Sequence, residues 1–410
     1  MSLQVDGQRL LRDLAELADI GRDPAGGLSR TSFSPADAHA RAWYAAKCEE
    51  AGLTLGLDGL GNIVAGLPGH DDEPAVWSGS HLDTVPRGGA FDGALGAVAA
   101  LECVRRLAEA DMQLRRPVRA VVFSDEEGNY NHLLGSTAMR RGFSEEELAA
   151  MTGRDGDRLV DALNGWTWAR GSRTDTRVDP ARLHAFVELH IEQGPQLEQQ
   201  GIRIGVVTSI VGLSGGLVRF HGRADHAGTT PMDARSDALL AAAQFIGAMP
   251  GLAQASGPVS VITTGRVRVQ PGGANQVPEL AEVSLDFRDP SRERVAAMLE
   301  AIGRSAQEAA EAHGVAAEWH ADEIVDPVPL DEGIRDIIGG CAADLGLSKT
   351  DIASGAGHDS QNMALLTPTA MIFVPSRAGR SHVPVEYTTD EDVVAGADVL
   401  LAVLRRLADT

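Results

Sequence analysis

The sequence predicts an α/β protein in which a mostly parallel sheet is interrupted by a smaller, inserted α+β domain. Apolar, β-branched strands alternate with alanine- and leucine-rich helices on both sides of a central region, which is the pattern of a parallel sheet. Inside that region the order changes to strand, helix, strand, strand, helix, strand. A chain of 410 residues is also too long for one ordinary core and suits two domains.

The N-terminal part is expected to contain two helices and a pair of strands. Helical periodicity covers residues 10–20, and Ser34 followed by Pro35 marks the N-cap and first position of a helix that runs to about Glu50. Residues 55–67 have the pattern of a strand, a turn and a second strand.

Four buried strands follow, and each leads to residues that carry chemistry. A helix over residues 94–110 connects the first two, which predicts a right-handed parallel crossover. A glycine loop over residues 354–360 opens a helix before the last strand, and a closing helix covers residues 390–407. We also expect residues 144–180 to be mostly helical. The strands are 75–80 before His81, 117–124 before Asp125, Glu126 and Glu127, 184–189 before His190, and 369–374 before His382.

The central region matches the ferredoxin-like split motif, β-α-β-β-α-β. Its borders are expected near Gly212 and Val325, where a proline-rich segment returns the chain. The predicted domains are therefore 1–211 together with 326–410, and the insertion 212–325. The expected strands of the insertion are 217–220, 259–264, 282–288 and 317–320, and its helices are 233–248 and 292–313.

Composition and charge exclude several classes of protein. A net charge of -22 argues against binding to nucleic acid or to an anionic membrane surface, since both need a basic face. No stretch approaches the roughly 20 apolar residues of a membrane span, and the start lacks the pattern of a signal peptide, so we expect a cytoplasmic protein. Three widely separated cysteines do not suggest a disulfide framework.

Five possible metal ligands belong to one edge of the predicted sheet. Each has an ordinary explanation by itself, because a lone histidine after a strand is usually a surface or core residue and an aspartate before a helix is usually a cap. In open α/β sheets, however, ligands bind at the carboxyl ends of the strands. Three imidazoles with carboxylates suit two divalent ions, Zn, Mn, Co or Ni rather than Ca or Mg. The five are His81, Asp92, Glu127, His190 and His382.

The acidic side chains of this edge divide into different roles. Asp92 is expected to bridge two ions about 3.5–4 Å apart. Asp83, two residues beyond the first histidine ligand, would fix the orientation of a ligand ring. Neighbouring residues of an extended chain point in opposite directions, so we assign Glu127 to the metal and Glu126 to general base and then acid. Asp125 is left with a turn or supporting role.

Several motifs resemble the di-metal amidohydrolases of the M20 peptidase class. More narrowly, they are similar to the branch of N-carbamoyl-L-amino acid hydrolases, allantoate amidohydrolases and β-ureidopropionases. The resemblance covers residues 26–388 in the expected order. One departure is Asn129-Tyr130-Asn131-His132, where relatives often carry Arg-Phe. The motifs are Gly79–Thr84, Phe91–Gly93, Asp125–Gly128, Leu189–Pro195, His226–Met232 and Ser381–His382.

The resemblance implies a metallohydrolase whose inserted domain is a lid that also forms a homodimer. It assigns His226 to the oxyanion of the tetrahedral intermediate, reaching the partner subunit's site. It assigns Asn275 and Arg288 to the substrate carboxylate, and a guanidinium does grip carboxylates bidentately. The alternatives are turn chemistry for Asn275 and an ion pair with Asp286 or Asp289 for Arg288.

Three further residues match the family's pattern with two roles open for each. His358 and Asp359, in the glycine loop, either orient or line the site, with a helix cap as an equally economical explanation. Gln193 contacts either the ureido group of the substrate or backbone.

We therefore expect hydrolysis of the ureido C–N bond of a small carboxylated substrate. An N-carbamoyl-L-amino acid would give the amino acid, CO2 and ammonia. The second candidate substrate is allantoate or ureidoglycolate, and an acyl-amino acid or a dipeptide ranks behind both. A binding or scaffold protein of the same fold is the alternative from another class. It is less favoured because the five ligand positions and the base are all filled.

Overall fold

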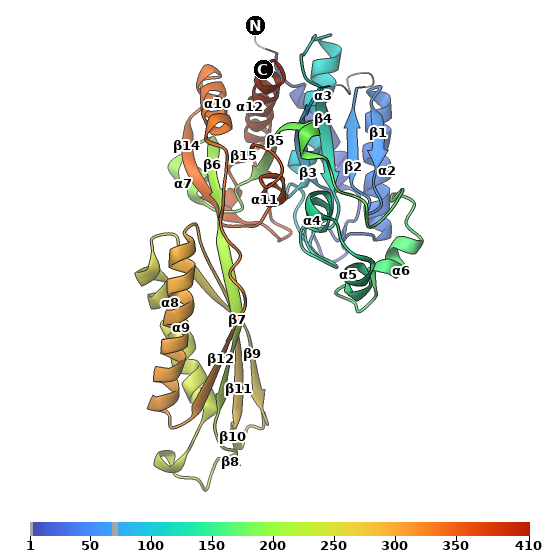
Figure 1. Cartoon of the computed structure of the whole chain (residues 1–410). Helices are drawn as coiled ribbons and strands as arrows, with labels where there is room; N and C mark the ends of the chain where they lie inside the picture. The colour runs from blue at the N-terminus through green and yellow to red at the C-terminus, as the bar shows by residue number, and fades with distance from the viewer. Residues whose placement is uncertain (1–2, 68–72) are drawn as a thin grey trace. The chain divides into compact units, whose positions relative to one another are not determined.

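The computed structural model describes residues 3–67 and 73–410 and divides into two compact units (Figure 1). The second unit runs from Ser209 to Pro329, and the first unit contains the chain on both sides of it. The predicted borders near Gly212 and Val325 lie a few residues inside the ends of the second unit.

Within the described residues, nine strands form the large sheet, and its centre is parallel. The pairs β4–β3, β3–β5 and β5–β15 are parallel, while β1–β2, β2–β4, β15–β6 and β6–β13 are antiparallel. This confirms the predicted fold class. In sheet order the strands are β1 (Thr54–Leu57), β2 (Ile63–Gly66), β4 (Val118–Phe123), β3 (Ala75–His81), β5 (Leu183–Ile191), β15 (Thr369–Val374), β6 (Ile204–Ile210) and β13 (Val328–Pro329), with β14 (Lys349–Ser354) beside β6.

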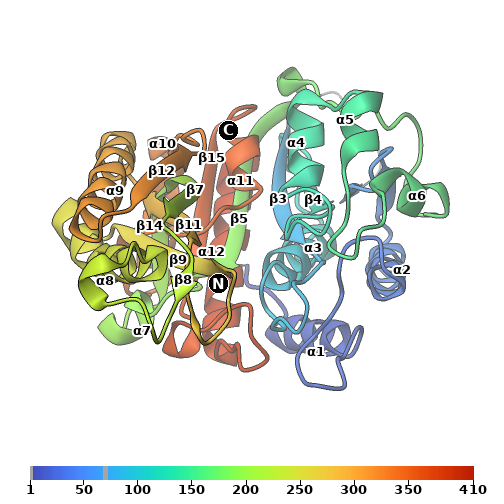
Figure 2. The same ribbon diagram turned by 90° about the horizontal axis from the view of Figure 1, so that it is seen from below.

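Helices cover both faces of this sheet (Figure 2). Side chains alternate along a strand, so Val76 and Val187 enter one apolar core while Trp77 and Phe186 enter another. The burial of both faces explains the continuous apolar runs in the sequence. The first core is covered by α1 (Gly7–Ala18), α2 (Pro35–Glu50), α3 (Ala94–Glu109), α10 (Glu332–Asp344) and α12 (Asp390–Ala408), and the second by α4 (Leu134–Arg141) and α11 (Ser360–Met363).

Local sequence predicts some elements well and others poorly. The Ser34 hydroxyl accepts from the Asp37 N–H at 3.2 Å and caps α2, as predicted. The expectation that residues 144–180 are mostly helical is wrong, because the segment contains only short helices and loops packed by side chains such as Trp166, whose ring meets Phe33 edge-on at 5.4 Å. Strand β14 was not predicted. The short helices of the first unit are α5 (Glu145–Ala150), α6 (Leu159–Asn164) and α7 (Gln196–Gln200).

The second unit has the strand order of the ferredoxin-like motif. Its sheet, as described, has the order β12-β7-β11-β9, so the fourth strand in sequence lies at one edge, followed by the first, third and second. All neighbouring pairs are antiparallel. The elements are β7 (Gly212–His221), α8 (Ala238–Ser256), β9 (Val261–Gln270), β11 (Leu280–Asp289), α9 (Arg292–Ala312) and β12 (Ala316–Ala321), with the short pair β8 (Asp225–His226) and β10 (Gln276–Val277).

Helix α8 is apolar on more than one side. It is the one helix of the described chain that is long and apolar enough to cross a membrane. Phe245 and Met249 nevertheless lie in the core of the second unit, so α8 is a core helix. Leu239 and Leu240 are exposed on its other side.

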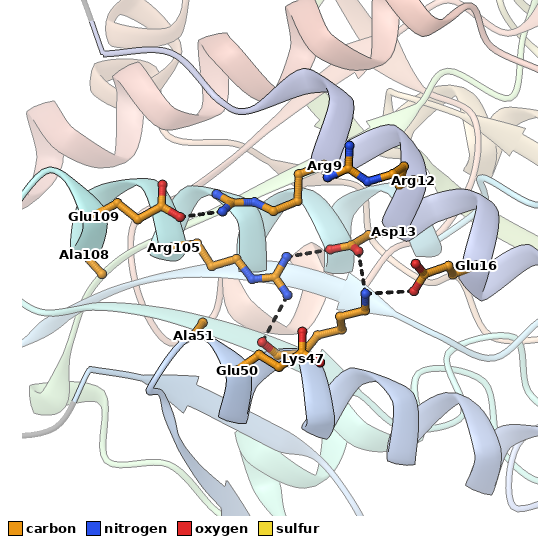
Figure 3. A pocket seen from close by; sticks show the side chains of 10 residues that line it. All are labelled: Arg9, Arg12, Asp13, Glu16, Lys47, Glu50, Ala51, Arg105, Ala108 and Glu109. Atoms are coloured by element: carbon orange, nitrogen blue, oxygen red, sulfur yellow. Dashed lines mark hydrogen bonds and ion pairs between the residues drawn. The ribbon is translucent and has the colours of Figure 1, made fainter.

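A network of ion pairs fixes α1 against α2 and α3 (Figure 3). Asp13 is buried and its two oxygens lie 2.5 Å from Arg105 Nη1 and 2.9 Å from Lys47 Nζ. Lys47 also pairs with the half-exposed Glu16 at 2.8 Å. A cavity between α1, α2 and α3 is lined by these residues and by other charged side chains of both signs. Because most of these charges are paired with one another, we interpret the cavity as structural.

Asp13→Ala is expected to lower the free energy of unfolding by about 3 kcal/mol, because it leaves the buried Arg105 without its closest carboxylate. Glu16→Ala is the matched control and should change it by less than about 1 kcal/mol, since an exposed pair contributes little. Denaturant unfolding of both variants measures the difference. Equal effects would contradict the structural role of Asp13.

Candidate metal centre

The predicted ligands of the first unit converge at the carboxyl edge of the parallel strands. His81 is the last residue of β3 and His190 lies one residue before the end of β5. Asp92 lies in the turn before α3, Glu127 in the loop after β4, and His382 in the loop after β15. Because β4, β3, β5 and β15 are neighbours in the sheet, their ends bring these residues together.

Asp92 is the centre of the cluster. Its Oδ1 lies 3.2 Å from His190 Nε2 and 3.6 Å from His81 Nε2. Its Oδ2 lies 3.4 Å from His382 Nε2, which is also 3.5 Å from Glu127 Oε2. One carboxylate therefore faces a histidine pair with one oxygen and a third histidine with the other.

Backbone carbonyls fix the orientation of two of the imidazoles. His81 Nδ1 is 3.0 Å from the Asp83 carbonyl, and His190 Nδ1 is 2.9 Å from the Ile191 carbonyl. A carbonyl only accepts, so each Nδ1 carries a proton, and Nε2 is the nitrogen left facing Asp92. The Asp83 carboxylate lies farther from His81 Nδ1, at 3.8 Å, and instead accepts from Ser32 Oγ at 2.9 Å.

The pKa values reflect carboxylates crowded in a buried site. Burial alone would raise the pKa of Asp92, but hydrogen bonds from His190, His382 and His81 outweigh it and hold the pKa well below its usual range. Burial, with Asp92 nearby, raises the pKa of Glu127 to about 7. The bond to Asp92 raises the pKa of His382 to about 9.

The donor set fits divalent cations. Two groups of possible ligands, His81 with Asp92 and His190, and Asp92 with Glu127 and His382, each have ligand atoms within 4.8 Å of one another, and they share Asp92. The buried Glu127 Oε1 has no hydrogen-bond partner among the described residues. Imidazole nitrogens mixed with carboxylate oxygens favour zinc and similar ions over calcium or magnesium.

Glu126 and Glu127 point to different parts of the cluster, although not for the predicted reason. Strand β4 ends at Phe123, and Asp125 has φ of 55°, so the two glutamates do not lie on extended backbone. Glu126 Oε2 lies 3.5 Å from His81 Nε2, whereas Glu127 faces His382. Burial raises the pKa of Glu126 well above its ordinary value, with Glu127 adding to the effect and His81 opposing it.

Asp125 holds the loop that carries these glutamates. Its carboxylate accepts three backbone N–H groups, from Asn129 at 2.7 Å and from Tyr130 and Asn131 at 2.9 Å. These bonds close a turn around the side chain. The turn role left open for Asp125 by the sequence is the one that the structure has.

Two supporting residues were missed by sequence reasoning. Glu386 Oε1 accepts the backbone N–H of Phe91 at 2.9 Å and of Asp92 at 3.0 Å, and so fixes the turn that presents Asp92. Arg30 is fully buried and its Nε donates to the Leu82 carbonyl at 2.6 Å, beside His81. No local pattern marks either residue, because their partners are distant in sequence.

The other predicted residues of the first unit surround the cluster. Gln193 Nε2 donates to Asp92 Oδ2 at 2.7 Å. The ring of His358 packs against that of His190 with centroids 4.5 Å apart, and His358 Nε2 lies 3.0 Å from Ser354 Oγ. Asp359 precedes α11 but its side chain makes no capping hydrogen bond.

The second unit brings only two of its three predicted residues together. His226 pairs with Gln276 across β8 and β10, and the Ala227 N–H donates to the Asn275 carbonyl at 3.0 Å, so His226 and Asn275 are neighbours. Arg288 pairs with Asp286, Nε to Oδ1, at 2.9 Å, which is the alternative that the sequence left open.

Arg288 lies at the end of the four-stranded sheet that is remote from the β8–β10 pair. Leu280, at the start of β11, pairs with His221 at the end of β7 and with Gln270 at the end of β9. The chain continues from His221 to β8 and from Gln270 to β10, so this end of the sheet is the one near the β8–β10 pair. Arg288 is eight residues farther along β11, which is about 27 Å in an antiparallel strand. One copy of the second unit therefore does not bring Arg288 to His226 and Asn275.

The sequence model described as Peptidase family M20/M25/M40 matches residues 77–406. The chain belongs to this family. A relative from Paenarthrobacter aurescens, named N-carbamoyl-L-amino-acid amidohydrolase, is 39% identical over 99% of this chain and 100% of its own length. A relative from Oryza sativa subsp. japonica, named ureidoglycolate hydrolase, is 34% identical over 98% of this chain and 85% of its own length.

This M20 chain also resembles a solved structure in its fold. An amidase of the hydantoinase/carbamoylase family from Burkholderia multivorans superimposes with a TM-score of 0.92 at 33% identity, covering 100% of both chains. The predicted family and fold class are confirmed. The chain is a hydrolase of carbon–nitrogen bonds other than peptide bonds.

Metal binding is expected to release protons and to strengthen as the pH rises from about 6 to 9. The metal-free protein holds protons on His382, with a pKa of about 9, and on Glu127, with a pKa of about 7, and both must lose them to bind a cation. Calorimetric titration of Zn²⁺ or Mn²⁺ in buffers of different ionisation enthalpy counts the protons.

His382→Ala should reduce the number of protons released at pH 7. His313→Ala, which removes a half-buried histidine of the second unit, should leave it unchanged. Binding that releases no protons at this pH would contradict the ligand assignment.

Proposed function

We propose that the protein hydrolyses the ureido C–N bond of an N-carbamoyl-L-amino acid to the amino acid, CO2 and ammonia. The observation that carries the proposal is a buried glutamate, Glu126, placed 3.5 Å from a ligand of a cluster that fits two divalent ions sharing Asp92. End-to-end similarity to a relative named for this reaction supports the substrate class.

The ligand roles follow the two groups around Asp92. His81 and His190 would hold one ion and His382 with Glu127 the other, with Asp92 between them. When bound, such ions supply Lewis-acid chemistry that lowers the pKa of water and polarises a carbonyl.

Glu126 moves the proton. It takes a proton from water as general base and then gives it to the leaving nitrogen as general acid. Burial raises the pKa of Glu126 above its ordinary value, which favours its taking up a proton during the reaction. Gln193, hydrogen-bonded to Asp92, is our proposed contact for the ureido group.

The second unit contributes three residues of the proposed site. We assign His226 to the oxyanion and Asn275 and Arg288 to the substrate carboxylate. Roughly 27 Å of β11 lies between Arg288 and the strand end near the other two residues, and a small substrate does not span this length. The three residues therefore serve one substrate only if two subunits share each site. Arg288 pairs across the sheet with Leu213, where the chain enters this unit, so we assign Arg288 to its own subunit's site.

A dimer through the second unit also fits its surface. Leu239 and Leu240 on α8 are exposed, and so are Val261 and Val267 on the edge strand β9 beside it. Association would cover this apolar surface and the unpaired strand edge. The three cysteines are free and buried, which agrees with our proposal of a cytoplasmic location.

Allantoate or ureidoglycolate is the second candidate substrate. The relative named ureidoglycolate hydrolase favours it, because that name specifies the same ureido chemistry on a different acid. An acyl-amino acid or dipeptide ranks behind both. A scaffold without activity is less favoured, since the ligands and Glu126 are all present and converge.

Glu126→Gln is expected to lower kcat by at least about 100-fold, because the amide cannot accept the proton. Metal content, measured by elemental analysis, should not change. The assay is ammonia release from a panel of N-carbamoyl-L-amino acids, allantoate and ureidoglycolate. Glu145→Gln, an exposed change in α5, is the matched control.

Full turnover by the Glu126→Gln protein on a confirmed substrate would show the base assignment to be wrong. Release from allantoate or ureidoglycolate alone would favour the second candidate. If the metal-loaded enzyme releases no ammonia from any substrate of the panel, ureido hydrolysis is contradicted.

Mixing inactive Glu126→Gln and His226→Ala subunits is expected to restore about a quarter of wild-type activity, because half of randomly formed dimers are mixed and each has one complete site. Glu126→Gln mixed with Arg288→Ala should restore none, since Arg288 serves its own subunit. Subunits are exchanged in mild denaturant and assayed after refolding. Recovery with Arg288→Ala but not with His226→Ala would reverse the assignment.

A further inference from the structure

His132 contacts the residue that we assign as the base. It lies in the loop between β4 and α4. His132 Nδ1 lies 2.7 Å from the Glu126 carbonyl, and because that oxygen only accepts, Nδ1 donates. The Leu133 N–H donates to the same carbonyl at 3.1 Å. The main chain of Glu126 is thus held by the side chain of His132 and by the turn that follows it.

The other edge of the same ring lies against the glycine loop. A Cβ atom placed on Gly357 would be 2.8 Å from Gln361 Oε1 and 2.9 Å from His132 Nε2, both closer than real Cβ contacts. Gly357 therefore allows the close approach of an imidazole to the backbone. One side chain contacts both the loop of Glu126 and the loop that carries His358.

The glycine loop leads on to a predicted metal ligand. Gln361 Oε1 accepts the His358 N–H at 3.0 Å and so fixes the loop next to Gly357. The His358 ring then packs on His190, with centroids 4.5 Å apart. His132 is thus connected to Glu126 on one side and, through Gly357 and His358, to His190 on the other.

We propose that His132 is a positioning residue that fixes Glu126 relative to the His190 side of the site by bridging the Glu126 carbonyl and Gly357. This inference rests on the proposed function, because it assigns His132 a part in the same hydrolysis. His132 is itself exposed, so the ordinary alternative is a surface histidine in the turn before α4 with no effect on turnover. A role in holding the base predicts a change in kcat with little change in KM.

The experiment uses four full-length proteins: His132→Ala, His132→Asn, Gly357→Ala and the double variant His132→Ala/Gly357→Ala. His132→Ala should lower kcat about 10- to 100-fold, with KM within about twofold of wild type, because small misplacements of a catalytic group are costly. His132→Asn should recover most of kcat, since its amide can still donate to the Glu126 carbonyl.

The double variant tests the contact itself. Gly357→Ala should lower kcat in the His132 protein, where its methyl group meets both the ring and Gln361 Oε1. When residue 132 is alanine, only the part due to Gln361 should remain, so the two effects should not add. The thermal unfolding midpoints of the same four proteins and wild type should show the same non-additivity. This second measurement needs neither substrate nor bound metal.

Three results would overturn the inference: wild-type kcat for His132→Ala, a His132→Asn protein as slow as His132→Ala, or additive effects in the double variant. Failure of the proposed function looks different, because wild type itself would then release no ammonia from any ureido substrate. In that case the contact would still be refuted if the changes in unfolding midpoint of the two single alanine variants added up to that of the double variant.

Discussion

The burial of several carboxylates at one edge of a parallel sheet is the constraint on which the site depends. Asp83, Asp92 and Glu126 are all buried at this edge, and Glu127 adjoins them. Neighbouring negative charges in a poorly solvated site repel one another strongly, and such groups take up protons unless cations neutralise them. The raised pKa values of Glu126 and Glu127 express that demand. The fold thus places anionic ligands where only cations or protons stabilise them.

Three of the five predicted ligands, His81, His190 and Asp92, are held in place by hydrogen bonds from behind. The rings of His81 and His190 donate to backbone carbonyls, and Glu386 fixes the backbone of the Asp92 turn. These bonds connect each ligand to main chain in or beside the sheet, and fixed partners reduce the ordering that metal binding must impose. The loop that carries the two glutamates folds around Asp125, whose carboxylate accepts three backbone N–H groups of that loop.

The success of sequence reasoning here depends on how local each signal is. The cap at Ser34 and the histidines at the ends of β3 and β5 are placed correctly because a residue and its strand or helix are adjacent in the chain. Glu386 was missed because it is 294 residues from Asp92 and no periodicity relates them. The segment 144–180 was misjudged because its polar composition suits helices, whereas tertiary contacts such as Trp166 on Phe33 decide its conformation.

The resemblance assigned Asn275 and Arg288 to one substrate group, but one copy of the second unit separates them by most of the length of a ten-residue strand. A motif shows which residues act, not which subunit supplies them. If both residues act, a complete site needs two chains, and association becomes a condition for catalysis rather than an addition to it. The apolar side of α8 then has a functional reason to remain exposed in a single chain, because covering it assembles the site.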